Sequence, residues 1–227
     1  MCVVNFLAHL LLACERPRTP TEPWPGPAVL VGSLLPDLVR GHYRGPMSAA
    51  LRAGYDSHLL VDRLTDRHPA FARSREALRP TAGRFAPVLV DVIYDHCLAR
   101  QWSAFCDLPL QTFCRYAHAD IGRFFESDGT GVDTRGGEGQ TLPEGVQRVG
   151  RMLAAERWLD RYHTPEGLEL TLAAMAHRFT RRFRRPVDLS PVIAALPELI
   201  PRLDPDLAAL FGDLVAQTRT TQTRPTP

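Results

Sequence analysis

The 227-residue chain contains no lysine, and all 27 of its basic residues are arginine. Its net charge is only +2, which gives no general argument for a nucleic-acid partner. No run of 18 apolar residues occurs, so no membrane insertion is expected. Five cysteines without a CxxC pair indicate neither a disulfide framework nor a zinc knuckle. These absences favour a globular protein with reduced thiols, in the cytoplasm.

The chain also lacks a convincing alternating strand pattern, and apolar side chains instead recur every three or four residues. We therefore expect an all-α protein, with a single-domain helical bundle over residues 1–217 and a disordered tail at 218–227. Proline-rich 15–27 and glycine-rich 127–140 are expected to be loops. The expected helices cover 5–13, 28–41, 47–67, 73–79, 83–105, 109–126, 143–162, 165–184, 190–200 and 205–217.

The segment NFLAHLLLAC, residues 5–14, is open to two interpretations. Its last four residues fit a lipoprotein cleavage site, but no basic residue precedes Arg16, as a signal peptide requires. On a helix, Asn5 and His9 would instead be neighbours on one face, apart from the apolar stripe. A polar pair on an apolar helix needs partners if it is buried.

A histidine and two aspartates share the segment HLLVDRLTD, residues 58–66. His58 and Asp62 are four residues apart, so on a helix their side chains point the same way. Two interpretations stay open for this pair. It forms a hydrogen bond within one helix, or it supplies two ligands to a shared metal ion.

A second polar group interrupts the apolar segment DVIYDH, residues 91–96. Asp91 and Asp95 repel each other on a helix face unless a cation lies between them. His96 diverges from Asp95 by about 100°, so one of the two could bind a ligand while the other supports it. Carboxylates and imidazoles from several helices form divalent-metal sites in bundles, and this mixture suits Mn²⁺, Mg²⁺ or Fe better than structural zinc.

Five sequence blocks follow one another between residues 5 and 168: NFLAHLLLA, GSLLPDLVRG, DSHLLVDRLTDRHP, RFAPVLVDVIYDHCLARQW and ERWLDRYHTPEGL. Together they resemble the acyl carrier protein phosphodiesterase family, which is similar to a branch of the helical HD-type metal phosphohydrolases. The resemblance implies hydrolysis of the phosphodiester that joins 4′-phosphopantetheine to a serine of acyl carrier protein. It also implies acyl carrier protein as partner and a divalent metal, typically manganese.

The resemblance assigns a role to matching residues of this sequence. The expected metal ligands are His9, Asp37, His58, Asp95 and His96. The expected catalytic carboxylates are Asp37, Asp62 and Asp91. Leu59 stands where the family motif has an arginine that follows the histidine, so Arg63 is the expected substitute for binding phosphate.

The densest basic cluster contains Arg178, Arg181, Arg182, Arg184 and Arg185. Because acyl carrier proteins resemble one another in being acidic, Arg181 and Arg182 are expected to bind the substrate, and a plain solvated face is the competing interpretation. Two alternatives for the function stay open. The leucine at position 59 favours a phosphohydrolase with a different phosphoester substrate, and a helical module that binds carrier domains without turnover is the other.

Overall fold

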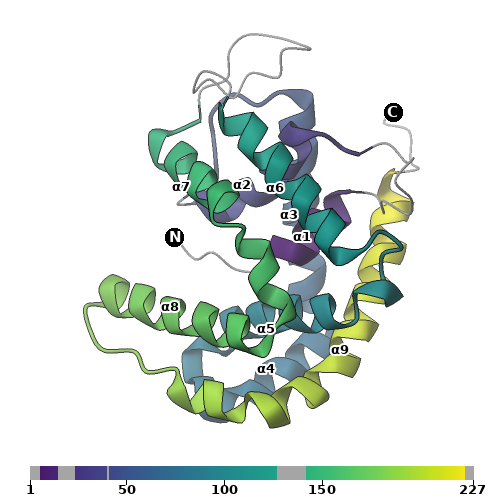
Figure 1. Cartoon of the computed structure of the whole chain (residues 1–227). Helices are drawn as coiled ribbons and strands as arrows, with labels where there is room; N and C mark the ends of the chain where they lie inside the picture. The colour runs from purple at the N-terminus through teal and green to yellow at the C-terminus, as the bar shows by residue number, and fades with distance from the viewer. Residues whose placement is uncertain (1–5, 15–23, 40, 127–141, 223–227) are drawn as a thin grey trace.

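The computed structural model describes residues 6–14, 24–39, 41–126 and 142–222, and every regular element in these ranges is a helix (Figure 1). The expected all-α class is therefore confirmed. None of the described helices combines the length and the apolar character needed to cross a membrane. The elements are α1 (Phe6–Ala13), α2 (Pro27–Leu38), α3 (Ala49–Arg67), α4 (Pro69–Ala82), η1 (Gly83–Phe85), α5 (Ala86–Arg100), η2 (Trp102–Ala104), α6 (Leu110–Glu126), α7 (Glu144–Ala155), η3 (Trp158–His163), α8 (Pro165–Phe183) and α9 (Ser190–Gln222), where η marks a 3₁₀ helix.

The centre of the molecule is formed by α1 and α5. Every residue of α1 is buried, as expected of a helix that is apolar on nearly all sides. Helices α2, α3, α6 and α7 pack together on one side of this centre, and α4, α8 and α9 lie on the other (Figure 1). The centre is thus the place where side chains from both halves meet.

Helices α2 and α3 approach each other more closely than side chains would allow, and two glycines make this approach possible. A Cβ atom at Gly54 would lie 2.0 Å from the carbonyl oxygen of Val29. One at Gly32 would lie 2.2 Å from the carbonyl oxygen of Leu51. Only a residue without a side chain fits such contacts between two backbones. The contact fixes the position of the N-terminal half of α3 relative to α2.

Side-chain caps fix where three helices begin. Ser48 caps α3, His68 caps α4 and Thr164 caps α8, each accepting a hydrogen bond from a backbone N–H in the first turn. His68 also ends α3, because Pro69 follows it and disfavours a helical conformation at the residue before it. The predicted helices at 47–67 and 165–184 correspond closely to α3 and α8.

Three other predicted helices have different limits in the structure. The segment 83–105 forms α5 with the 3₁₀ helices η1 and η2 on either side of it. Gly83 turns the chain with a φ of 54°, and α5 starts only at Ala86. The segment 143–162 divides after α7, because Arg157 adopts a left-handed conformation with a φ of 48°. The short helix expected at 73–79 extends over the whole of α4.

Helix α9 differs most from expectation. Prolines inside the segment predicted two helices, at 190–200 and 205–217, and a tail from residue 218. The structure has one continuous helix that reaches Gln222. Its internal prolines lie on the exposed face, where the carbonyl groups that lose an N–H partner can bind water. The opposite face is a leucine stripe against α4, formed by Leu196, Leu199, Leu203 and Leu207.

Polar contacts join α9 to α4 alongside this stripe. The Ser74 hydroxyl donates to Asp206 at 3.0 Å and accepts from the Tyr94 hydroxyl at 2.7 Å. Arg73 also binds Asp206, and His68 lies 3.1 Å from Asp213. Helix α9 is therefore held against α4 by both apolar and polar contacts. Most of the loop predicted at 15–27, and all of that at 127–140, lies outside the described residues.

Candidate metal and catalytic site

His9 of α1 meets His58 and Asp62 of α3 at the centre of the molecule. The two imidazole rings stack with centroids 3.8 Å apart and an angle of 11° between their planes. The Nε2 atoms of His9 and His58 lie 3.3 Å and 3.2 Å from the two carboxylate oxygens of Asp62. One ligand atom from each residue lies within 4.8 Å of the other two, so this group could bind a metal ion.

The orientation of His58 is set by α2. Its Nδ1 atom lies 2.7 Å from the carbonyl oxygen of Ser33, and since a carbonyl can only accept, Nδ1 carries the proton. Nε2 is then the atom that faces Asp62, where a bound cation would take the place of its proton. An imidazole fixed through its other nitrogen in this way is the usual arrangement of a metal-binding histidine.

The protonation states of His9 and Asp62 also suit a cation. Burial, together with the nearby His58, lowers the pKa of His9 to about 4, which keeps this imidazole neutral. Burial acts to raise the pKa of Asp62, but hydrogen bonds from His58 and His9 outweigh it and lower that pKa. A neutral imidazole and an ionised carboxylate are the forms in which these side chains bind metals.

Asp37 of α2 and Asp91 of α5 complete the acidic surroundings of this group. Burial, opposed by the charge of His58 and reinforced by that of Asp62, raises the pKa of Asp37 to about 7. Burial and then the charges of Asp62 and Asp37 raise the pKa of Asp91 well above its usual range. The Asp37 Oδ2 atom is buried and has no hydrogen-bond partner among the described residues. A buried acceptor of this kind needs a ligand, and a cation would offset the repulsion among the carboxylates.

Asp95 binds backbone groups. Its Oδ2 atom accepts the N–H of Leu7 at 2.9 Å, and its Oδ1 atom accepts the N–H of Ala8 at 3.0 Å. These amides belong to the first turn of α1, where N–H groups have no partner within the helix. Burial raises the pKa of Asp95 to about 7, although the amides oppose that rise. Asp95 therefore holds the helix that carries His9.

His96 is turned toward a different part of the protein. Its Nδ1 atom lies 2.7 Å from the carbonyl oxygen of Tyr162 in η3, and the charges that act on its pKa come from Arg100, Asp204 and His163. Of the residues predicted from the sequence, the structure brings together His9, Asp37, His58, Asp62 and Asp91. Asp95 and His96 have the partners just described.

The predicted substrate-binding arginines lie at the surface. Arg63 is exposed on α3, directly after Asp62. Arg181 and Arg182 are exposed near the C-terminal end of α8, where they line a cavity. Sequence reasoning missed the Ser33 carbonyl, because a backbone acceptor has no side-chain signature. The glycine before it, in the block GSLLPDLVRG, is the signal of close backbone approach that could have pointed there.

Replacing Asp95 by alanine should destabilise the fold, because it leaves two buried N–H groups of α1 without an acceptor. Each such group costs about 1 to 3 kcal/mol, so we expect the free energy of unfolding to fall by about 2 to 6 kcal/mol. Denaturant titration followed by circular dichroism measures this change. Asp95→Asn keeps one carbonyl oxygen and should lose less; an alanine variant as stable as the wild type would contradict the capping role.

Comparisons with known proteins give matches over most of the chain. Residues 4–214 match the family described as acyl carrier protein phosphodiesterase, a range that includes every residue of the group. Curated relatives named acyl carrier protein phosphodiesterase include one from Enterobacter sp. (strain 638), 31% identical over 179 residues, and one from Klebsiella pneumoniae (strain 342), 32% identical over 179 residues. Each alignment covers 78% of this chain and 80% of the relative. No solved structure matches the chain, so the likeness to HD-type phosphohydrolases stays a prediction.

Proposed function

The chain belongs to the acyl carrier protein phosphodiesterase family, and on this premise we propose that it hydrolyses holo acyl carrier protein to apo carrier protein and 4′-phosphopantetheine. The observation that carries the proposal is the meeting of His9, His58 and Asp62 beside the buried, unpartnered oxygen of Asp37. Hydrolysis of a phosphodiester needs a group that offsets phosphoryl charge and a group that accepts a proton from water. This arrangement has residues of both kinds.

His9 and His58, through Nε2, and Asp62, through its carboxylate, would hold the divalent metal ion. Mn²⁺ is the proposed ion, with Mg²⁺ and Fe²⁺ as alternatives, because the ligands combine imidazoles with carboxylates. When bound, the ion would counter negative charge on the phosphoryl oxygens and lower the pKa of a water molecule. Asp95 and His96, proposed as further ligands from the sequence, would act indirectly here, Asp95 by seating α1 and His96 by binding η3.

Asp37 and Asp91 are the proposed proton acceptors. A carboxyl group with a pKa of about 7, as at Asp37, is suited to exchange protons near neutral pH. The water oxygen forms a bond to phosphorus as the bond from phosphorus to the carrier's serine oxygen breaks. The carboxylate takes a proton from the water and returns it to the serine oxygen, so both products leave with their protons balanced.

Arginines on the surface would bind the substrate. Arg63 follows Asp62 on α3 and is the proposed phosphate contact in place of the family arginine at position 59. Arg181 and Arg182 are the proposed contacts for an acidic carrier protein, because both are exposed and neither has an ion pair with a described residue. A carrier-protein substrate also fits the cytoplasmic location that we propose.

Leu59 supports a second candidate function, hydrolysis of a different phosphoester. A side chain without charge at this position removes one phosphate contact that the family motif supplies, and the substrate would change with it. A third candidate, a carrier-binding module without turnover, keeps the arginine surface and loses the chemistry. The three candidates differ in what happens to holo acyl carrier protein.

Incubation of the purified protein with holo acyl carrier protein and Mn²⁺, followed by mass spectrometry, separates them. We expect the carrier to lose the mass of its 4′-phosphopantetheine group, and removal of the metal by a chelator to stop the reaction. An intact holo carrier together with hydrolysis of a small phosphodiester would favour the second candidate. Binding of the carrier without hydrolysis of either substrate would favour the third.

A further inference from the structure

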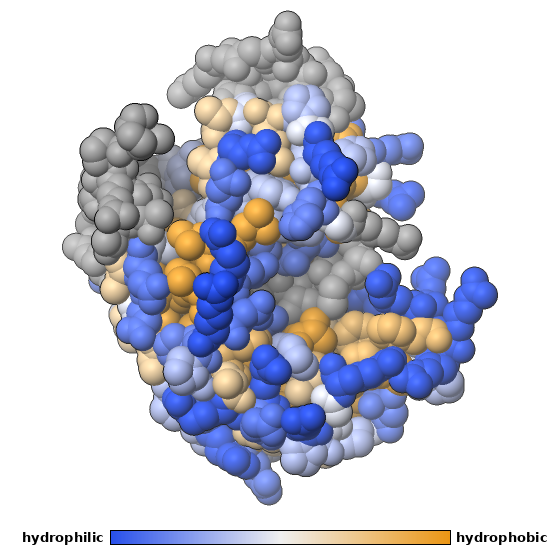
Figure 2. Space-filling view, turned by 180° about the vertical axis from the view of Figure 1, so that it is seen from behind, coloured by the Kyte–Doolittle hydropathy of each residue, from blue (hydrophilic) through white to orange (hydrophobic). Residues whose placement is uncertain are grey.

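A cavity of about 980 Å³ lies between the C-terminal end of α8, the loop after α2 and the start of α5. Its walls combine two kinds of side chain. Arginines and apolar residues line it, namely Val39, Phe85, Val88, Arg178, Phe179, Arg181, Arg182, Phe183 and Arg184, together with Gly41. Among the described residues, no acidic side chain belongs to this lining. Figure 2 shows the same mixture along the arm that α8 forms, where an apolar band is flanked by hydrophilic side chains.

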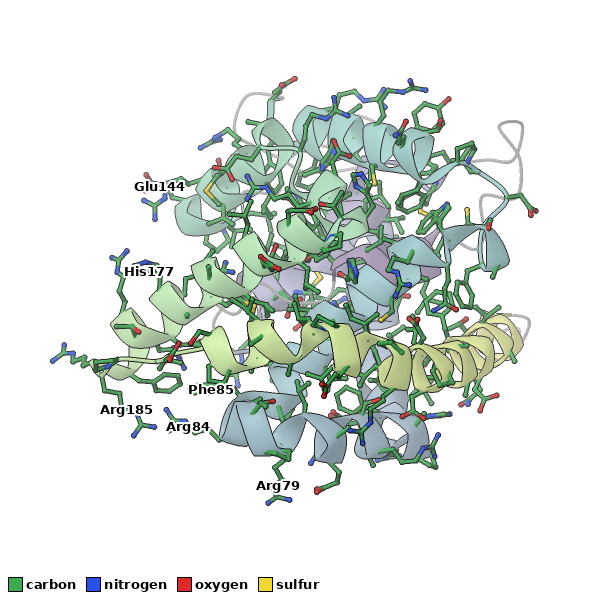
Figure 3. The ribbon with its side chains drawn as sticks, turned by 60° about the horizontal axis from the view of Figure 1, so that its bottom comes forward. Arg79, Arg84, Phe85, Glu144, His177 and Arg185 are labelled. Carbon is green, nitrogen blue, oxygen red and sulfur yellow. The ribbon has the colours of Figure 1, made fainter. Side chains whose placement is uncertain are left out.

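The apolar wall of the cavity is aromatic. Phe85 stacks on Phe179 with ring centroids 4.7 Å apart, and Phe183 lies 5.8 Å from Phe85. Arg84 lies over both Phe183 and Phe85, and Figure 3 shows Arg84 and Phe85 beside the end of α8. Phe183 is 40% exposed, so part of this wall faces solvent. An exposed aromatic wall of this kind suits the apolar part of a ligand.

The charged side of the cavity selects for an anion. Arg178, Arg181, Arg182 and Arg184 are exposed, and none of them forms an ion pair within the described part of the chain. Four unpaired guanidinium groups on one concave surface attract anions, and each offers a forked donor that matches a phosphate. An anionic ligand with an apolar body would satisfy both walls.

Two residues of the cavity lining lie close along the chain to the catalytic carboxylates. Val88 precedes Asp91 by three residues on α5, and Val39 follows Asp37 by two residues. Arg178 provides a third connection, through Tyr162. Burial raises the pKa of the Tyr162 hydroxyl well above its usual range; the charges of Asp95 and Asp37 add to that rise, and the charge of Arg178 opposes it. The α5 wall of the cavity therefore shares a helix face with Asp91.

Resting on the proposed function, we propose that this cavity receives the 4′-phosphopantetheine arm of the carrier protein. The phosphodiester lies at the inner end, within reach of Arg178, and the arm's methyl and methylene groups lie against the aromatic wall. The remaining arginines, at the mouth, face the acidic carrier. Arg178 thus adds a second guanidinium group near the phosphate, beside that of Arg63, which takes the place of the family arginine at position 59.

Equilibrium binding to the purified full-length protein tests the assignment without turnover. Calorimetric titrations with 4′-phosphopantetheine, pantetheine and inorganic phosphate separate the contributions of the arm and the anion. We expect 4′-phosphopantetheine to bind at least about tenfold more tightly than inorganic phosphate. Arg178→Gln and the cavity-filling Val88→Phe should each weaken it about tenfold or more, whereas Arg185→Gln, the same change of charge outside the cavity lining, should not.

The outcome distinguishes this assignment from the proposed function. Normal binding of 4′-phosphopantetheine by Val88→Phe and by Phe183→Ala would overturn the assignment, even if holo carrier is cleaved. The same would follow if phosphate alone bound as tightly as 4′-phosphopantetheine. If the arm binds as expected but holo carrier stays intact, the assignment stands and the proposed function fails. Phe183 is partly exposed, so its alanine variant keeps the test open if Val88→Phe does not fold.

Discussion

Replacing Asp62 by alanine should lower hydrolysis of holo acyl carrier protein by at least about 10²-fold while leaving the helices intact. Asp62 contacts both His9 and His58, so its loss removes a proposed metal ligand and also the acceptor that orients two imidazoles. Its side chain is 51% exposed, so the fold should tolerate the smaller residue. Turnover, bound metal after gel filtration and circular dichroism measure the three effects.

Asp56→Ala provides the matched control for this experiment. Asp56 lies on the same helix and is exposed, but it belongs to none of the groups around His9 and His58. We expect this variant to keep the metal content and the turnover of the wild type. Retention of both by Asp62→Ala would show that the residue is not a ligand, and equal losses in the two variants would point to damage of α3 instead.

A large effect on stability is also expected for Gly54→Ala. The added methyl group would lie 2.0 Å from the carbonyl oxygen of Val29, a backbone atom that cannot turn away. The two helices must separate, and overpacking of this kind costs about 1 to 3 kcal/mol or more. For a chain of this length that corresponds to a fall in Tm of about 2 to 12 °C. Metal affinity should fall as well, since the separation lengthens the 2.7 Å contact between Ser33 and His58.

Gly212→Ala tests whether the effect comes from the contact or from glycine itself. Gly212 lies in α9 with no atom within 4 Å of the position that a methyl group would occupy. Alanine there should raise stability by up to about 1 kcal/mol, because it favours the helix more than glycine does. Thermal unfolding of both variants should therefore shift in opposite directions, and a shift in the same direction would contradict the close-contact argument.

Helices whose ends have local signals were predictable from the sequence. Helix α3 has a serine cap at its start and a proline just after its end, so its limits follow from nearby residues. Helix α9 was predicted as two pieces, because proline is a poor helix residue. What the sequence could not show is that the prolines lie on the solvent side, while the leucine stripe packs on α4. Tertiary packing decided the outcome over local preference.

The candidate site was also predictable from the sequence only in part. The spacing of His58 and Asp62 placed both on one face, and the structure has them in contact. The family resemblance predicted a metal ligand at Asp95, and a buried carboxylate needs partners. A metal ion and the free amides of a distant helix both meet that need, and the amides come from residues 88 and 87 positions away along the chain. Such a pairing has no local signal in the sequence.

The cap on α1 has a consequence for the order in which this protein matures on the ribosome. His9, His58 and Asp62 emerge first, but Asp95 must follow before α1 has an acceptor for its amides. Helix α9, which packs on α4, is made later still, because its Asp213 lies 145 residues after its partner His68. Synthesis proceeds at about 5 to 20 residues per second, so the three proposed metal ligands are made several seconds before the rest of the chain. We therefore expect metal capture to follow the synthesis of Asp95.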